Sequence, residues 1–376
     1  MIRHVAQLVL VLALAMPALT GCGGGSRSVG SNKGLKTPKL PPVNPEALKE
    51  FDAGMRALKL GGPDATEKAK TRFLTATQRD DKLWEAWHNL GLIYFNDGDD
   101  SQALDALGKA ISINPAQLEA RLARAEAARR SGKTKQASDD YQVIIRERPD
   151  DRLGYARLAS LLRQRGKYEG ALDVLRSALR QAGADSQIYV ELALIYLAQG
   201  RDELAELILR RAIGLDDKQP GVHNAIALVL LARGKDQQAF ERFDYATSLD
   251  HKYVDARFNA ASVLLDSGDY GRAKEMLTEL VGQAPDDFEA KVALGVALRG
   301  LKDYDGASRT WEAVAKSPTA TTRVRADALW NLAVLEADIK MEDASAKRAL
   351  DRYLQNSPSN HAKRKQAEER RKELGQ

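Results

Sequence analysis

Small and apolar residues recur along this chain with a period of 34 residues. One series consists of glycines: Gly98, Gly132, Gly166, Gly200, Gly234 and Gly268. A second series consists of alanines: Ala103, Ala137, Ala171, Ala205, Ala239, Ala273 and Ala307. A third lies seven positions after each alanine: Ala110, Ile144, Ala178, Ala212, Ala246, Leu280 and Val314. Three series at one period predict an array of repeats that share one local fold.

The segment 84–117 indicates what that local fold is. Apolar and small residues in its first half lie at helical spacing on one face: Trp87, Leu90, Gly91 and Tyr94. Gly98 can adopt positive φ and close this helix, whereas Pro115 cannot continue a second one. Gly91 and Ala103 are small, so we expect the two helices to approach closely there. Each repeat is therefore predicted to be a helical hairpin.

The same segment resembles the tetratricopeptide repeat. The matching residues are Trp87, Leu90, Gly91, Tyr94, Gly98, Ala103, Leu107, Ala110 and Pro115. Seven regular units follow in register over 84–321: 84–117, 118–151, 152–185, 186–219, 220–253, 254–287 and 288–321. The resemblance implies an all-α solenoid of about nine hairpins in a right-handed superhelix. The first helix of every unit is then expected to line a concave groove.

Three parts of the array depart from the regular pattern. Divergent hairpins are expected at 46–83 and 322–360, because the terminal repeats of a solenoid have one face in water. Lys302 stands where the seventh unit should have its glycine, so we expect an altered turn near Gly300. Residues 361–376 are rich in charge and are expected to form a helix that caps the stack. A nucleic-acid-binding arm is the alternative for this tail.

Charge and motifs argue against nucleic acid and catalysis. The net charge is +5, but the residues before Glu46 carry +5 and the tail +3, which leaves the helical body near −3. Such a body favours no basic track for nucleic acid. The single cysteine excludes an intramolecular disulfide, and the five histidines lack the spacing of a metal site.

One short motif needs a separate explanation. The residues from Ser131 to Thr134 resemble the end of a phosphate-binding loop, but Ala127 stands where that loop needs a glycine. Gly132 also belongs to the 34-residue series. We therefore expect no enzyme, no cofactor, no metal and no small-molecule substrate.

The N-terminus resembles the export signal of bacterial lipoproteins. A short basic start and an apolar run over residues 5–18 are typical of a secretory signal. The lipobox-like sequence follows at once: Leu19, Thr20, Gly21 and Cys22. The resemblance implies removal of 1–21, acylation of Cys22, and a flexible linker over 22–45. Gly23 after the cysteine implies the outer membrane, with the array facing the periplasm; an ordinary signal peptide with a chance cysteine is the alternative.

By analogy with the family, the groove is lined by side chains of each first helix. The candidate set is His88, Asn89, Leu92, Phe95, Arg129, Arg157, Val190, Leu194, Leu197, Asn224, Leu228, Leu231, Phe258 and Asn259. These residues predict a basic, polar section that leads into an apolar one. Such a groove suits a helical or extended protein segment with aliphatic anchors. The alternative is that the leucines pack between neighbouring repeats.

The combination of repeats and lipobox predicts a membrane-anchored scaffold for protein–protein interactions. It is similar to the repeat lipoproteins that act as pilotins for type IV pilus secretins, and to those of the myxobacterial gliding-motility apparatus. We therefore expect a role in a trans-envelope machine of one of these two kinds. The alternative is an adaptor that regulates cell-wall synthases or hydrolases at the outer membrane.

Overall fold

The computed structural model describes residues 40, 42–339, 341–359 and 361–374. The predicted signal peptide, the lipobox residues Leu19, Thr20 and Gly21, and Cys22 lie outside the described residues, so the calls on them stay predictions. In the described part of the chain, all the regular elements are helices. None of those helices is long and apolar enough to cross a membrane.

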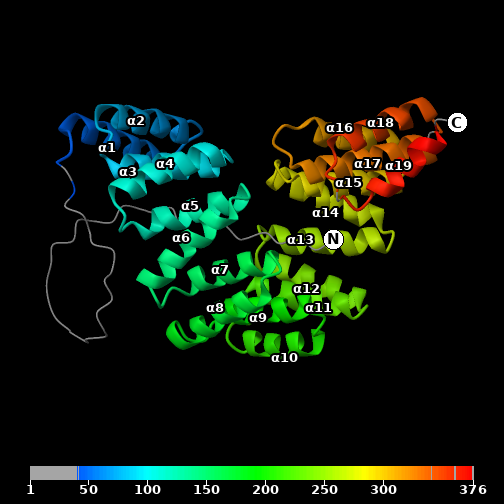
Figure 1. Cartoon of the computed structure of the whole chain (residues 1–376), viewed down its shortest axis with the longest axis horizontal. Helices are drawn as coiled ribbons and strands as arrows, with labels where there is room; N and C mark the ends of the chain where they lie inside the picture. Colours follow the sequence, from blue (N-terminus) through cyan, green and yellow to red (C-terminus); the bar gives the residue numbers. More distant parts are fainter. Residues whose placement is uncertain (1–39, 41, 340, 360, 375–376) are drawn as a thin grey trace. The chain divides into compact units, whose positions relative to one another are not determined.

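Nineteen helices follow one another in the described residues (Figure 1). The first hairpin is α1 (Pro45–Leu60) with α2 (Ala65–Arg79). The regular hairpins are α3 (Trp84–Asn96) with α4 (Asp100–Ile113), α5 (Leu118–Arg130) with α6 (Thr134–Glu147), α7 (Arg152–Gln164) with α8 (Tyr168–Gln181), α9 (Ser186–Ala198) with α10 (Asp202–Ile213), α11 (Pro220–Ala232) with α12 (Asp236–Leu249), α13 (Val254–Asp266) with α14 (Tyr270–Gln283), and α15 (Phe288–Gly300) with α16 (Tyr304–Lys316). The last hairpin is α17 (Thr322–Asp338) with α18 (Asp343–Asn356), followed by α19 (Arg364–Glu373). The predicted all-α fold of about nine hairpins is confirmed.

The described chain divides into two compact units, one ending at Leu215 and one beginning at Asp216. The first unit holds α1 to α10 and the second holds α11 to α19. Within a unit, the helices of each hairpin pack on each other, and the first helices of most consecutive hairpins also touch. The last helix of the first unit, α10, has 12 residues, whereas the second helices of the three hairpins before it have 14 each.

The repeating alanines form the close contacts inside the hairpins. All seven, from Ala103 to Ala307, have no exposed surface. Gly91 plays the same part in α3, because a Cβ at this position would lie 2.5 Å from Cγ of Leu107 on α4. At Gly91 not even a methyl group fits without a shift of Leu107, so the two helices come closest there. The interpretation of the small residues as close-approach positions is confirmed.

The turns between the two helices of each regular hairpin share one backbone conformation. All six glycines of the first series have positive φ, between 67° and 82°. The seventh turn does not differ, since Lys302 itself has φ of 64°. The expectation of an altered turn near Gly300 is therefore wrong. Gly300 ends α15, and a Cβ there would overlap the ring of Tyr270 on α14.

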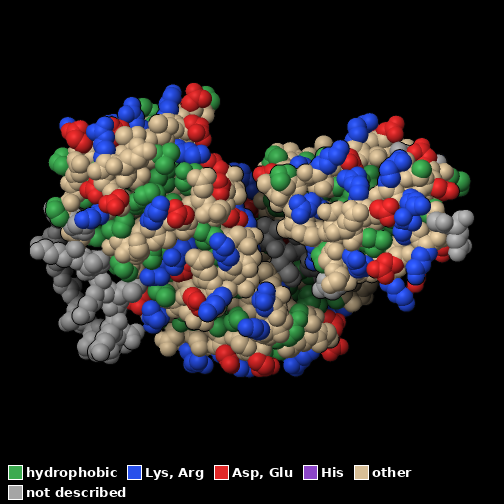
Figure 2. Space-filling model, turned by 45° about the horizontal axis from the view of Figure 1, so that its top comes forward, with side chains coloured by type: hydrophobic (Ala, Val, Ile, Leu, Met, Phe, Trp, Pro, Cys, Tyr) green, Lys and Arg blue, Asp and Glu red, His purple; other side chains and the backbone are tan. Residues whose placement is uncertain are grey.

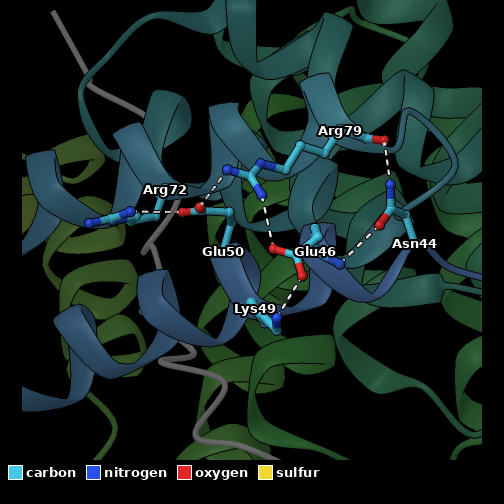
Figure 3. A network of polar contacts seen from close by, with 6 residues as sticks. All are labelled: Asn44, Glu46, Lys49, Glu50, Arg72 and Arg79. Carbon is cyan, nitrogen blue, oxygen red and sulfur yellow. Dashed lines mark hydrogen bonds and ion pairs between the residues drawn. The ribbon is translucent and has the colours of Figure 1, made fainter.

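The first and the last of the described helices are held by polar contacts. At the N-terminal end, Arg79 of α2 pairs with Glu46 at 3.3 Å and with Glu50 at 3.1 Å on α1, as Figure 3 shows. Asn44 caps α1 by accepting a hydrogen bond from the amide of Glu46 and donates one to the carbonyl of Arg79. These contacts link the two helices of the divergent first hairpin at their surface.

The C-terminal helix α19 packs on α18 and is tied to the last hairpin by arginines. Arg370 pairs with Asp338 of α17 at 3.0 Å, and Arg371 pairs with Asp351 of α18 at 2.5 Å. Ala367 of α19 is fully buried. These two positive charges of the tail are thus paired with carboxylates of the last hairpin.

Candidate protein-binding surfaces

The predicted groove residues lie on the first helix of their hairpins but differ in exposure. Half of them are buried: Phe95, Val190, Leu194, Asn224, Leu228, Phe258 and Asn259. The other half are partly exposed: His88, Asn89, Leu92, Arg129, Arg157, Leu197 and Leu231. The buried half offers a partner almost no surface, so in these described residues only the second half is placed to touch one.

The predicted basic section is neutralised from within. Glu126 of α5 pairs with Arg129 at 3.0 Å and with Arg157 of α7 at 3.1 Å. The hydroxyl of Tyr141 on α6 donates a hydrogen bond to the same carboxylate at 2.8 Å. Burial raises the pKa of Tyr141 far above its ordinary value of 10, so this hydroxyl keeps its proton. Arg157 therefore joins two neighbouring hairpins, whereas Arg129 pairs within its own helix.

A second ion pair is buried more deeply in the same unit. Arg163 of α7 meets Glu191 of α9 at 3.0 Å, and both side chains are less than a tenth exposed. Nearby in the array, Asp140 of α6 accepts hydrogen bonds from Arg124 at 2.7 and 2.8 Å. Buried charges are tolerated only when they are paired in this way. The arginines of this part of the array form ion pairs within the protein and do not make up a basic groove.

The second unit has an uncharged pair between two of its first helices. The side-chain amide of Asn259 on α13 donates to the side-chain oxygen of Asn224 on α11 at 3.0 Å. Both side chains are buried. This hydrogen bond links the first helices of two consecutive hairpins.

A different arrangement is found where α3 packs beside α5. We call the surface formed by Trp84, Glu85, His88, Asn89, Leu92, Glu119 and Leu122 the α3–α5 face. All but the exposed Glu119 are partly buried. The ring of His88 stacks on that of Trp84, with centroids 6.2 Å apart. Burial lowers the pKa of His88 although Glu119 raises it, so the imidazole is neutral at pH 7.

Two polar atoms of the α3–α5 face are buried without a hydrogen-bond partner in the described structure: Nε1 of Trp84 and Oε2 of Glu85. Burial also raises the pKa of Glu85. An unpaired buried polar atom costs about 1–3 kcal/mol. Both atoms are enclosed by the protein, so they offer a partner no direct contact. What the α3–α5 face exposes is Glu119 and parts of His88, Asn89, Leu92 and Leu122.

Sequence reasoning found His88, Asn89 and Leu92 of this face and missed Trp84, Glu85 and Leu122. Trp84 is the first residue of its repeat, and a residue at this position is predicted only to begin the first helix. Whether its indole nitrogen finds a partner depends on side chains that the local sequence does not reveal.

No group of three or more histidine, cysteine, aspartate or glutamate side chains is arranged to hold a metal within the described residues. The phosphate-loop-like segment is explained by the repeat, because Gly132 has φ of 76° and closes α5 like its counterparts. Arg124, which lines the surface hollow beside it, is already paired with Asp140.

The family comparison agrees with this geometry. Family models of the tetratricopeptide repeat match residues 84–117, 162–229, 258–321 and 303–361, which together make up more than half of the chain. The chain belongs to the tetratricopeptide-repeat family. Arrays of this family are scaffolds for protein–protein interactions and are typically not enzymes. No curated protein matches this tetratricopeptide-repeat protein by sequence.

Solved structures show the same fold at low identity. A tetratricopeptide repeat protein from Parabacteroides merdae is 16% identical over 68% of this chain and 100% of its own, with a TM-score of 0.58. A human IFIT1 dimer with m7Gppp-AAAA is 15% identical over 89% of this chain and 87% of its own, also at 0.58. PilF of Pseudomonas aeruginosa is 20% identical over 58% and 97%, but its TM-score of 0.46 supports no argument.

These likenesses extend to the fold of the tetratricopeptide-repeat protein and no further. The capped RNA belongs to the IFIT1 structure. The expectation that this chain binds no nucleic acid stays a prediction.

Proposed function

We propose that this tetratricopeptide-repeat protein is a membrane-anchored scaffold that holds a protein partner on its α3–α5 face. The observation that carries the proposal is the cluster of partly exposed apolar and polar side chains on two neighbouring first helices, with Leu92 of α3 and Leu122 of α5 beside His88 and Asn89.

The chemistry of the face defines the partner. Leu92 and Leu122 offer apolar contact for an aliphatic side chain, whereas the partly exposed His88 and Asn89 offer polar groups beside them. A helical or extended peptide segment supplies both kinds of group at once. The neutral imidazole of His88 adds no charge that such a segment would have to compensate.

The location and the machine rest on the sequence. The lipobox-like residues before Cys22 support acylation of that cysteine, and the Gly- and Pro-rich linker supports a tether between lipid and array. We therefore place the scaffold at the outer membrane, facing the periplasm, in a trans-envelope machine for gliding motility or type IV pilus secretin assembly.

Immunoprecipitation from detergent-solubilised envelopes tests the partner. The native chain should recover secretin or motility subunits, and the double variant Leu92→Glu, Leu122→Glu should lose them while its helical circular dichroism stays normal. Leu60→Glu changes an equally apolar but distant, 86% exposed residue and should keep them. Recovery of cell-wall synthases or hydrolases instead would replace the machine by the adaptor alternative. Recovery that survives the double variant would remove the α3–α5 face from the proposal.

Fractionation tests the anchor separately. Cys22→Ser removes the acylated atom and should move the protein from the membrane to the soluble periplasmic fraction. Unchanged retention in the membrane would contradict lipidation at this residue and leave the binding face unaffected.

A further inference from the structure

The outward side of α10 differs from that of every other second helix of the regular repeats. Leu207 is 61% exposed on this helix. At the same position of the repeat the other six units carry a charged residue: Asp105, Asp139, Asp173, Glu241, Glu275 and Arg309. A single exposed leucine is ordinary in proteins. A leucine at a position that is charged in all six other regular units calls for an explanation.

Two neighbours extend the apolar character of this surface. Leu204 lies one turn before Leu207 and is partly exposed, as is Ile208. The position of Leu204 is polar or glycine in the other regular units: Gln102, Gln136, Gly170, Gln238, Arg272 and Gly306. We call Leu204, Leu207 and Ile208 the α10 stripe. Residues three and four apart share one helix face, so the stripe is continuous.

Charges of opposite sign flank the stripe. The first turn of α10 is acidic and its last turn is basic. Glu203 and Arg211 are both exposed, and each lies four residues from Leu207, one on either side. If a second α10 lies antiparallel with a two-fold axis through Leu207, Glu203 of one copy faces Arg211 of the other, twice. The surface is therefore complementary to itself in charge, and the apolar stripe of one copy meets that of the other.

We propose that two copies of this chain associate through α10, antiparallel and related by a two-fold axis at Leu207. A two-fold interface of this kind uses the same patch on both copies, which is the commonest symmetry of soluble oligomers. The apolar stripe supplies the buried centre and the Glu203–Arg211 pairs supply the rim and the orientation. The dimer would double the number of binding faces on one scaffold and so raise the avidity for a repeated partner.

Sedimentation velocity of the full chain carrying Cys22→Ser, in a non-ionic detergent, measures this association. The chain should sediment as a dimer, and Leu207→Glu should weaken dimerisation at least tenfold because it places two carboxylates at the axis. Leu60→Glu, at an even more exposed leucine of α1, should leave the dimer intact.

A charge swap decides whether the second copy is the partner. Glu203→Arg and Arg211→Glu should each weaken the dimer, because each opposes like charges, and the two changes in one chain should restore it. A heterologous partner would not be restored by this double change. Circular dichroism of the single variants separates a weakened interface from a disturbed helix.

Disulfide trapping adds a geometric readout. Cys22 is the only cysteine, so Leu207→Cys in the Cys22→Ser chain carries one thiol per copy. This thiol lies on the proposed axis and should oxidise rapidly to a covalent dimer, whereas Leu60→Cys should not. A monomer at concentrations up to about 100 µM, a dimer insensitive to Leu207→Glu, or a double swap that fails to restore association would each overturn the proposal.

Discussion

The turns of the sixth and seventh regular repeats reach one backbone conformation with different residues. Gly268 has φ of 80° and Lys302 has φ of 64°. In the sixth turn the amides of Gly268 and Asp269 donate to the carbonyls of Leu265 and Leu264, at 3.2 and 2.9 Å. In the seventh, the amide of Lys302 donates to the carbonyl of Arg299 at 3.0 Å, and Asp303 repeats the second bond at 2.9 Å.

This comparison teaches that the hairpin, rather than the residue, imposes the left-handed conformation. The left-handed conformation destabilises a lysine by roughly 1–2 kcal/mol, and the backbone hydrogen bonds that close the helix remain the same. What the seventh repeat gains is a glycine two residues earlier, which lets Tyr270 of the preceding hairpin pack against the end of α15. Gly268 therefore provides the left-handed backbone of the sixth turn, whereas Gly300 leaves room for the ring of Tyr270 beside the seventh.

Gly300→Ala should have the largest effect on this pair of turns. The new Cβ would overlap the ring of Tyr270, so the aromatic side chain or the end of α15 must move. We expect the free energy of unfolding, from urea titration, to fall by about 2–3 kcal/mol. Gly282→Ala is the matched control, because a Cβ on this helical glycine of α14 meets nothing within 4 Å. A loss as large in the control would mean that the packing on Tyr270 is not the cause.

Gly268→Lys gives the sixth turn the residue of the seventh. The left-handed backbone should be kept, and the free energy of unfolding should fall by about 1–1.5 kcal/mol. Urea unfolding measures the loss, and backbone chemical shifts show whether the turn is retained. If the turn reorganises instead, the hairpin does not impose the conformation and the comparison fails.

The aspartates that follow the two turns should contribute equally. Asp269 accepts a hydrogen bond from the amide of Arg272 at 3.2 Å, and Asp303 accepts one from the amide of Gly306 at 2.9 Å. Both cap the second helix of their hairpin, so Asp269→Ala and Asp303→Ala should each cost about 1 kcal/mol in the same titration. A clear inequality would show that the two turns are less alike than their backbones.

Lys302→Gly should have the smallest effect and the opposite sign. Glycine relieves the left-handed strain but loses more freedom on folding, so a net gain of about 0.5 kcal/mol is expected. Thermal or urea unfolding against the native chain measures it. Lys302→Asn should fall between the two, because asparagine tolerates this conformation better than lysine. A loss of stability in the glycine variant would show that the lysine side chain makes a contribution of its own.

The hairpins of this protein could be predicted closely from its sequence. The seven regular first helices begin at residues 84, 118, 152, 186, 220, 254 and 288, which are the starts of the repeats. Glycine, alanine and apolar residues act through local sterics and through contacts within one hairpin, and these repeat whenever the pattern repeats. Lys302 escaped prediction because a lysine has no local preference for positive φ.

The binding surface could be predicted only in part. Leu228 is 2% exposed whereas Leu231, three residues later on α11, is partly exposed. Arg163 would suit a basic groove by its position, yet Glu191, 28 residues away, pairs with it. The same arginine would bind a partner if another residue stood on the next helix.

The sequence by itself determined the repeat, its helical hairpins and the close-packed alanines, because each depends on residues within about one turn or one hairpin. Only the tertiary structure decided which side chains of the first helices remain available and which are paired or buried. It also decided that Trp84 and Glu85 keep unpaired polar atoms and that Leu207 meets solvent. Exposure and pairing depend on neighbours brought together by folding, and partners such as Arg163 and Glu191 lie far apart in the sequence.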